Sequence, residues 1–151
     1  MSKIATRFMN TFAALVLLAV AALLPGLHDA AAAKSSRTVV YHIDDSARAV
    51  RMLRNITNHR HADADIRVVV VAMAGGIDFL LDGALDEQGN SYDAQVDPLM
   101  LEGVEFRVCN NTLKGRHIDK DKLLPDVQIV PAGVAELARL QLDEGAAYIR
   151  P

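Results

Sequence analysis

The sequence predicts an α/β fold: a three-layer, doubly wound and mainly parallel sheet of about five strands, with helices on both faces. Apolar runs of strand length alternate along the chain with segments whose apolar residues recur at helical spacing. One run, residues 66–72, is rich in β-branched residues and almost continuously apolar, as in strands that are covered on both faces. Such alternation of strands and helices is typical of a parallel sheet flanked by helices.

The N-terminal region has the basic, apolar and small-residue parts of a secretory signal peptide. Lys3 and Arg7 supply the basic part, residues 12–24 are apolar throughout, and a run of alanines ends at Ala33. The apolar run is shorter than the roughly 20 residues of a membrane span. We therefore expect residues 1–33 to be a signal peptide cleaved near Ala33, and the protein to be periplasmic or secreted. An uncleaved membrane anchor is the alternative.

The remaining residues, 34–151, are expected to form one domain. The formal net charge of −3 becomes −4 once two basic residues and one acidic residue leave with residues 1–33. A mildly acidic chain without a basic stripe has no electrostatic footprint for nucleic acid, so we predict no nucleic-acid partner, and no membrane contact after cleavage. Cys109 is the single cysteine, and an unpaired thiol in an exported protein implies a reactive group or an intermolecular bridge.

The first part of this domain is predicted to hold two strands with a helix between them. Asp44, Asp45 and Ser46 offer N-caps for the helix, and Gly75-Gly76 ends the second strand. The predicted elements are a strand over 38–43, a helix over about 47–58, a strand over 66–72, a short turn or helix over 77–81 and a loop over 82–92.

The second part is predicted to hold three strands and two further helices. Asp97-Pro98 looks like an N-cap followed by proline in the first turn, and Gly103 suits the end of that helix. The later elements are a strand over 104–109 with a helical turn after it, a surface segment over 115–124, a strand over 127–130, a helix over about 134–144 and a short strand over 147–149.

Cys109 is the residue around which the chemistry is predicted. It ends a strand and is followed by Asn110, Asn111 and Thr112, residues that favour helix N-caps and turns. Free backbone N–H groups at the start of a helix would face the sulfur and lower a thiol pKa from about 8.5 into the range of roughly 3.5 to 7.5. The alternative is that a lone cysteine is a small buried hydrophobe.

The ends of the predicted strands select the other candidate residues, because ligands of open parallel sheets bind beyond the carboxyl ends of the strands. We expect these residues to meet at one edge of the sheet. They are His42 and Asp44 after the first strand, Gly75 and Gly76 after the second, Cys109, Asn110 and Asn111 after the third, and Gly133 after the fourth.

Each of these candidates has a simpler alternative. His42 could serve as a base for the thiol or be a core histidine bonded to backbone. Gly75-Gly76 permits close approach to an anion or forms a tight turn. Arg116 could place positive charge near a thiolate or lie in a solvated loop.

No cofactor and no metal are predicted. The chain has neither a G-x-G-x-x-G nor a Walker-type lysine motif, so a nucleotide cofactor is not expected. His59-Arg60-His61 suggests a metal site at first sight. Residues two apart on a helix point to different faces, however, and basic residues at a helix C-terminus ordinarily complement its dipole.

Several segments of the chain resemble the DsrE/DsrF-like family, and the likeness runs from about Thr38 to Pro151. They are Val39–Asp44, Val69–Ala72 with Gly75–Leu81, Gly103–Leu113 and Val130–Ala138. The Cys-Asn-Asn-Thr-Leu and Pro-Ala-Gly-Val-Ala-Glu-Leu stretches are the most specific parts, and they resemble the exported branch of the family.

The resemblance implies a small doubly wound α/β domain that assembles into homotrimers or hexamers. The best understood members are sulfur-relay proteins, in which a single cysteine between a strand and a helix accepts sulfane sulfur as a persulfide and passes it on. Cys109 matches that position, and Arg116 is similar to an arginine that follows the cysteine closely in those members.

The leading hypothesis is therefore a periplasmic, sulfurtransferase-like sulfur carrier with a donor or acceptor protein as partner. Cys109 would be the nucleophile, the backbone amides of Asn110 and Asn111 would stabilise its thiolate, and His42 and Arg116 would assist electrostatically. Two alternatives remain: a non-enzymatic oligomeric module that binds a small ligand or anion, and a structural or partner-binding oligomer whose thiol is simply buried.

Overall fold

The computed structural model of the protein describes residues 37–151. The predicted signal peptide, residues 1–33, and its expected cleavage near Ala33 lie outside this range. No helix within it is both long enough and apolar enough to cross a membrane.

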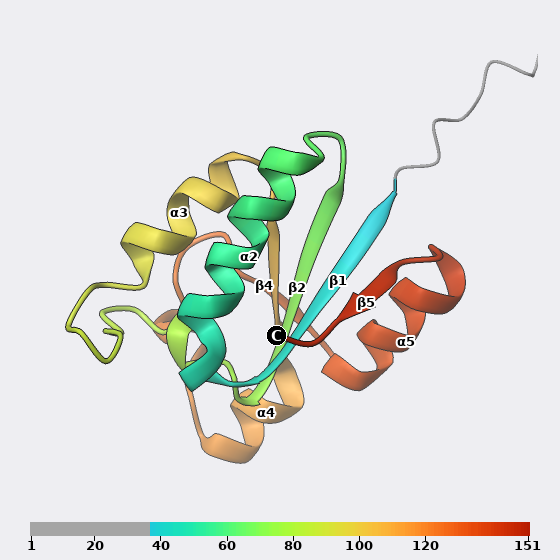
Figure 1. Ribbon diagram of the computed structural model, residues 1–151. Coiled ribbons are helices and arrows are strands. Elements are labelled where there is room, and N and C mark those ends of the chain that lie inside the picture. Colours follow the sequence, from blue (N-terminus) through green and yellow to red (C-terminus); the bar gives the residue numbers. More distant parts are fainter. Residues whose placement is uncertain (1–36) are drawn as a thin grey trace, which may run out of the picture. The chain divides into compact units, whose positions relative to one another are not determined.

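The described residues form an α/β fold around one parallel sheet (Figure 1). Its five strands are β1 (Thr38–Asp45), β2 (Arg67–Gly75), β3 (Glu105–Cys109), β4 (Gln128–Val130) and β5 (Ala147–Ile149). They lie in the order β4-β3-β2-β1-β5, and every neighbouring pair is parallel. The predicted fold class is confirmed. Because all strands run the same way, their carboxyl ends meet at one edge of the sheet.

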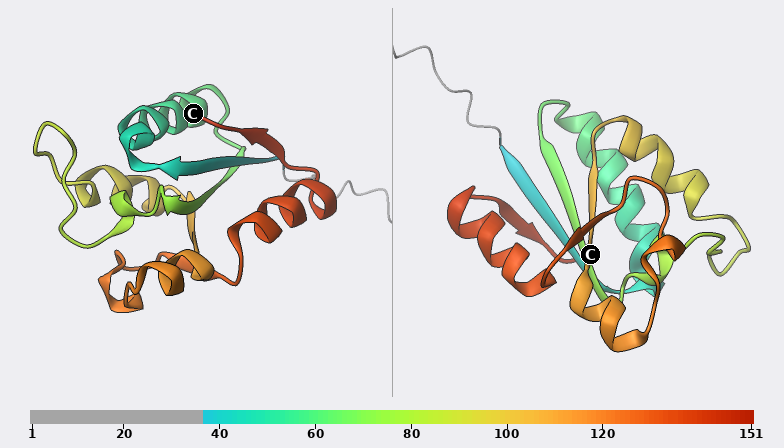
Figure 2. Two further views of the ribbon diagram at one scale, coloured as in Figure 1. Left: turned by 90° about the horizontal axis from the view of Figure 1, so that it is seen from below. Right: turned by 180° about the vertical axis from the view of Figure 1, so that it is seen from behind.

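Helices cover both faces of the sheet. The α-helices are α2 (Ala49–Ala62), α3 (Asp93–Leu101), α4 (Asn110–Arg116) and α5 (Gly133–Asp143), and the 3₁₀ helices are η1 (Ser46–Arg48), η2 (Asp78–Leu80) and η3 (Lys120–Lys122). Figures 1 and 2 show α2 and α3 on one side of the sheet and α5 on the other, with α4 at the carboxyl edge.

The face under α2 and α3 holds the larger hydrophobic core. Along β1 the side chains of Val39, Tyr41 and Ile43 point to this face, where Met52 and Ile56 of α2 pack against them. All five are at most 3% exposed. Full burial of a large aliphatic side chain stabilises the fold by roughly 1.5 to 3 kcal/mol, so this layer holds the sheet together.

The opposite face carries a smaller apolar cluster under α5. Val40, Val69 and Val71 of the sheet pack against Leu137 and Leu140 of the helix. Since successive strand residues point to opposite faces, a nearly continuous apolar strand such as β2 supplies both clusters. The prediction that this run is covered on both faces is correct.

A ring of alternating charges lies beside the smaller cluster, between the sheet and α5. Each arginine contacts two glutamates and each glutamate two arginines, in the sequence Arg67, Glu105, Arg107, Glu136, Arg139, Glu144 and back to Arg67. Arg107 and Glu136 have side chains only 10% and 11% exposed. The ring thus satisfies charges that the sheet face would otherwise bury unpaired.

The start of the third helix differs from the prediction. Asp97 was expected to be its N-cap, but α3 begins at Asp93, and Pro98 lies inside it. The loop before α3 closes early, through a bridge between Leu85 and Ser91, so the chain is free to turn into a helix at once. Gly103 does end this helix, with the φ of +89° that suits a left-handed position.

Other elements extend beyond their predicted limits. β1 continues to Asp45 and β2 to Gly75, so Asp44 and Gly75 lie within a strand rather than after it, as His42 also does. α2 continues to Ala62 and includes His59 and His61 in its last turn. β5, at residues 147–149, has the predicted bounds.

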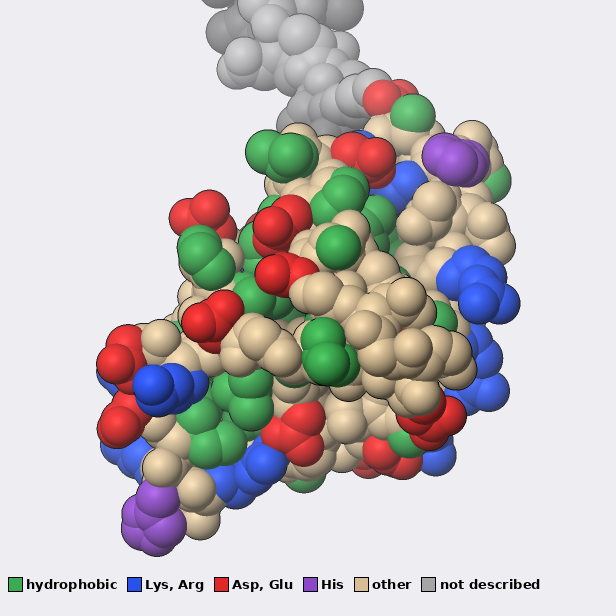
Figure 3. Space-filling model, turned by 90° about the vertical axis from the view of Figure 1, so that its left-hand side faces the viewer, with side chains coloured by type: hydrophobic (Ala, Val, Ile, Leu, Met, Phe, Trp, Pro, Cys, Tyr) green, Lys and Arg blue, Asp and Glu red, His purple; other side chains and the backbone are tan. Residues whose placement is uncertain are grey.

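The surface that carries α3 presents acidic, basic and apolar side chains interspersed (Figure 3). The described part of this face therefore offers no broad surface of one charge.

Candidate functional site

The junction of β3 and α4 places Cys109 at the carboxyl edge of the sheet. Cys109 is the last residue of β3 and the N-cap residue of α4, with φ −68° and ψ 114°. Phe106 and Val108 point into the larger core, so Arg107 and Cys109 point to the α5 side. The Cys109 residue is only 7% exposed.

Hydrogen-bond donors surround the Cys109 sulfur and lower its pKa. Burial alone raises the pKa of this thiol, but the backbone N–H groups of Gly133, Thr112 and Asn111, together with the Thr112 hydroxyl, lower it further than burial raises it. The thiol makes no strict cap hydrogen bond to the first turn of α4, as expected because neutral sulfur is a weak acceptor. The donors therefore act mainly on the thiolate form.

Gly133, the first residue of α5, packs directly against the cysteine. A Cβ atom at this position would lie 3.2 Å from Cys109 Cβ and 2.7 Å from Cε of Met73, a half-buried residue of β2. The absence of a side chain lets the backbone N–H of Gly133 reach the sulfur. The predicted residues Cys109, Asn111 and Gly133 are thus brought together.

Thr112 belongs to this group, although the sequence analysis did not select it. Its Oγ1 accepts the backbone N–H of Ala74 at 3.0 Å, and its hydroxyl is one of the donors that lower the pKa of Cys109. A signal for it was available: Thr112 is three residues after the N-cap Cys109, the spacing at which a side chain in the first turn reaches back to the cap residue.

Arg116 lies at the end of α4, where its guanidinium contacts the end of β2 and the start of η2. Nη1 donates to the carbonyl of Ala74 at 3.0 Å and lies 2.6 Å from Oδ1 of Asp78. The contact with Asp78 is an ion pair and not a hydrogen bond: Oδ1 of Asp78 accepts no hydrogen bond from any of residues 37–151. Arg116 therefore lies in α4 and not in a solvated loop, which was the alternative for this residue.

His42 and Asp44 form a second group, with residues at the C-terminus. Nδ1 of His42 is 2.7 Å from the hydroxyl of Tyr148, and Asp44 pairs with Arg150 at 2.5 Å. Burial lowers the pKa of His42, Asp44 raises it and Arg150 lowers it, with a net lowering that favours the neutral ring. The hydrogen bond from Arg150 lowers the pKa of Asp44.

The glycine pair is used for close packing at the end of β2. A Cβ atom at Gly76 would lie 2.4 Å from the carbonyl oxygen of Ile43, a contact that no side chain could make, whereas at Gly75 the nearest atom would be 3.5 Å away. The N–H of Gly76 donates to Met73. The contacts of this pair are those of a tight turn against β1.

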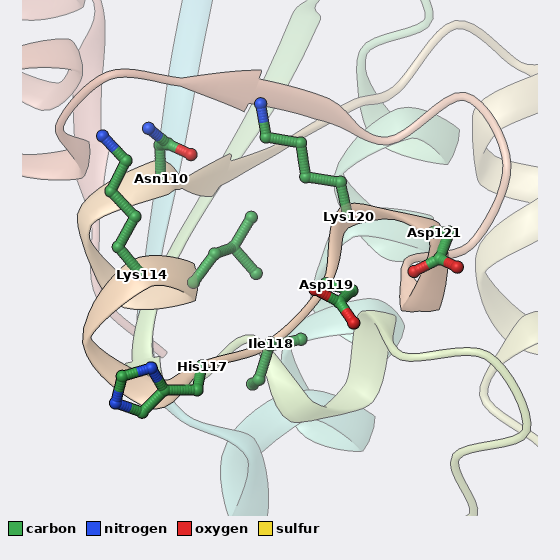
Figure 4. Close-up of a pocket in the computed structure, with 8 residues that line it drawn as sticks. Asn110, Lys114, His117, Ile118, Asp119, Lys120 and Asp121 are labelled. Atoms are coloured by element: carbon green, nitrogen blue, oxygen red, sulfur yellow. The ribbon is translucent and has the colours of Figure 1, made fainter.

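Asn110 lines an open hollow of about 760 Å³ between α4 and residues 117–121 (Figure 4). Its Oδ1 is buried and has no hydrogen-bond partner within the described chain. Leu113 and Ile118 supply apolar lining. Lys114 and Lys120 stand on opposite sides of the opening, and the other lining residues are His117, Asp119 and Asp121.

The described residues contain no group of three or more His, Cys, Asp and Glu side chains that could hold a metal ion. His59 instead lies 3.1 Å from the hydroxyl of Tyr41, and Arg60 bonds backbone carbonyls of Ala64, Ile66 and Glu102. His59 and Arg60 therefore hold the last turn of α2 against neighbouring segments of the chain.

Comparison with known proteins gives a family and two solved structures. The model of the DsrE/DsrF-like family matches residues 27–151. The protein of unknown function MTH1491 from Methanobacterium thermoautotrophicum is 37% identical, with a TM-score of 0.67 over 76% of this chain and 99% of its own. The ychN protein from E. coli shares the fold at 19% identity, with a TM-score of 0.63 over 77% of this chain and 99% of its own. No curated protein matches the chain.

Proposed function

Because the chain belongs to the DsrE/DsrF-like family, which is associated with sulfur relay, we propose that Cys109 accepts sulfane sulfur as a persulfide and passes it on. The observation that carries this proposal is the set of donors around the sulfur, from Gly133, Thr112 and Asn111. A thiolate is the nucleophilic form of cysteine, and these donors stabilise it.

The proposed reaction consists of two exchanges at sulfur. The Cys109 thiolate attacks the sulfane sulfur of a donor such as polysulfide or thiosulfate. A new S–S bond forms, the S–S bond of the donor breaks, and the rest of the donor leaves with the bonding electron pair. An acceptor thiolate then attacks the outer sulfur and Cys109 leaves as a thiolate, so the cycle needs no external oxidant or reductant.

A lowered thiol pKa supports both exchanges. It increases the fraction of thiolate that attacks in the first step, and a thiol of lower pKa leaves faster in the second. His42, whose lowered pKa keeps the ring neutral, enters the proposal as a proton acceptor on the α5 side of the sheet, the side to which Cys109 also points.

Mass spectrometry of the reduced chain after incubation with polysulfide or thiosulfate tests the proposal. We expect the added mass of one sulfur atom on the peptide that contains Cys109, removable by dithiothreitol, and no addition to the Cys109→Ser variant. We also expect alkylation of Cys109 to titrate below the ordinary thiol pKa of about 8.5. Unmodified wild-type protein after treatment with both donors would contradict the proposal.

The hollow beside α4 favours a second function, the binding of a small anionic ligand without sulfur chemistry. Its size of about 760 Å³ suits a small ligand, and the amines of Lys114 and Lys120, which share the lining with the carboxylates of Asp119 and Asp121, would bind a negative group on it. Calorimetry with thiosulfate separates the two functions. Binding that persists in Cys109→Ser and falls in a Lys114→Gln, Lys120→Gln variant would support this second function, and no measurable heat would exclude it for this probe.

The proposal includes export and assembly. The N-terminal sequence of the protein recovered from the periplasm is expected to begin near residue 34, after cleavage at Ala33. Light scattering of the mature protein is expected to give the mass of a trimer or hexamer; a monomer mass, or recovery of the intact chain in the membrane fraction, would contradict these two parts.

A further inference from the structure

Arg116 acts on Ala74 near the end of β2, and Ala74 also contacts Thr112, a donor to the Cys109 thiolate. The guanidinium holds the carbonyl of Ala74 at 3.0 Å, and the N–H of the same residue donates to Thr112 Oγ1 at 3.0 Å. Both polar backbone groups of Ala74 are therefore fixed by side chains of α4.

Ala74 is held in an unfavourable conformation. Its φ is +50°, a left-handed value that L-residues other than glycine seldom adopt. Such a strained residue persists only when the surrounding structure fixes it. The contacts from Arg116 and Thr112 are the side-chain hydrogen bonds that do so.

The direction of the Thr112 hydroxyl follows from this arrangement. A hydroxyl has one hydrogen and two acceptor lone pairs. One lone pair of Oγ1 takes the N–H of Ala74, so the oxygen is fixed in place and its hydrogen remains available to donate to the Cys109 thiolate, whose pKa the Thr112 hydroxyl lowers.

We propose that Arg116, paired with Asp78, is a positioning residue for the Cys109 thiol, and that it acts by holding the Ala74 backbone, which orients the Thr112 hydroxyl towards the sulfur. The biological meaning of this inference rests on the proposed persulfide function. Its mechanism differs from the direct electrostatic assistance expected from the sequence.

The two mechanisms predict opposite results for Asp78→Asn. If the charges act directly on the thiolate, loss of a carboxylate lowers the thiol pKa. If Arg116 acts by position, loss of Asp78 frees the guanidinium from the turn, the Thr112 hydroxyl is no longer oriented, and the pKa rises.

The experiment measures the rate of alkylation by iodoacetamide against pH in the purified full chain. Thr112→Val is expected to raise the midpoint by about one unit, since one hydrogen bond to the thiolate is lost, and Thr112→Ser is expected to restore it. Asp78→Asn and Arg116→Lys are expected to raise it by smaller amounts. Arg116→Lys keeps the positive charge, so direct electrostatics predicts no change for this variant.

A double variant shows whether Arg116 acts through Thr112. Arg116→Lys is expected to leave the midpoint of Thr112→Val unchanged, because the pathway is already broken. Additive shifts, a lowered midpoint in Asp78→Asn, or an unchanged midpoint in Thr112→Val would each overturn the proposal. Thermal unfolding is measured in parallel, and Asp78→Asn replaces Arg116→Lys in the double variant if the latter is unfolded.

The result is separable from the outcome of the persulfide test. Alkylation reports the thiolate whether or not sulfur is transferred. Midpoints that shift as expected in a protein that accepts no sulfur would leave this inference intact and remove the proposed function. A protein that accepts sulfur but whose midpoints do not shift would retain the proposed function and overturn this inference.

Discussion

At the scale of single residues, Gly133 shows how a missing side chain shapes the surroundings of the sulfur. The distances of 3.2 Å to Cys109 Cβ and 2.7 Å to Met73 Cε that a Cβ would have leave no room for alanine without movement. The Met73 contact is with the end of a flexible side chain and can be relieved by rotation. The contact with Cys109 can be relieved only by moving backbone, and the N–H that faces the sulfur moves with it.

Gly133→Ala is therefore expected to raise the pKa of Cys109 by about one unit and to destabilise the fold by about 1 to 3 kcal/mol. The measurements are the pH profile of alkylation and the urea midpoint. Gly115→Ala is the matched control, because a Cβ there meets nothing within 4 Å and alanine favours the helix. If both variants leave the thiol titration unchanged, the donor role of Gly133 is wrong.

The sequence predicted part of this group of residues. Cys109, Asn111 and Gly133 could be predicted from the sequence because each follows or ends a strand, and parallel strands end at one edge of the sheet. The contact of Arg116 with Ala74 could not be predicted from the sequence. The position of Ala74 depends on a left-handed backbone conformation, which an alanine in the sequence does not indicate. For His42, the contact with Tyr148 joins residues 106 apart in the chain.

At the scale of elements, the turn that ends β2 fixes how closely two strands approach. The 2.4 Å distance from a Cβ at Gly76 to the oxygen of Ile43 is a clash with backbone, which no change of rotamer relieves. The neighbouring Gly75 would make only an ordinary contact at 3.5 Å. A side chain is thus excluded at Gly76 and tolerated at the adjacent Gly75.

Gly76→Ala is expected to destabilise the fold by about 3 kcal/mol or more, whereas Gly75→Ala is expected to change stability by less than about 1 kcal/mol. Urea denaturation of both variants measures the difference. Equal effects of the two substitutions would show that the turn is not limited by this contact. Thiosulfate binding lost in Gly75→Ala without loss of stability would favour the anion-binding interpretation of the pair.

Element types were more predictable than element limits. Periodicity and glycine positions predicted the strands and the helices α2 and α5. The apolar face of α2 packs in the larger cluster, whereas α5 packs Leu137 and Leu140 in the smaller one and leaves Val134 and Leu142 exposed. The start of α3 was misplaced, because the Asp97-Pro98 pattern describes a common helix start, whereas the bridge between Leu85 and Ser91 is a tertiary contact.

At the scale of the whole molecule, the ring of six charges joins the sheet to α5. The pKa values of its glutamates are lowered: hydrogen bonds from Arg139 lower those of Glu136 and Glu144, and for Glu105 the pairing with Arg67 and Arg107 outweighs the effect of burial. The folded pKa values thus lie below the unfolded value of about 4.3. The contribution of the ring is fully present above that pH and is lost as the pH falls through the folded values.

Glu136→Gln is expected to lower stability by about 2 kcal/mol at neutral pH and to make the loss of stability between about pH 5 and pH 3 shallower than in the wild type. Urea midpoints across this range provide the measurement. Asp143→Asn, an exposed position of the same helix, serves as the control and is expected to change stability by about 0.5 kcal/mol or less. A Glu136→Gln variant with wild-type stability and acid dependence would show that the ring is not a stabilising unit.

The order of the strands was beyond prediction from sequence. The steps from β1 to β4 follow the chain, but α5 then carries the chain from β4 at one edge of the sheet to β5 at the other. Local patterns specify the elements of this connection, while the choice of edge depends on the free side of β1 and on the cluster under α5.

This late connection has a consequence for the thiol. One of the donors that lower the pKa of Cys109 is the first residue of α5, so the sulfur acquires its full reactivity only when the last helix has docked and the chain has crossed the sheet. During synthesis, or after loss of the C-terminal residues, the cysteine would lack the Gly133 donor and keep only the donors of Thr112 and Asn111. Its chemistry therefore reports whether the protein has been completed.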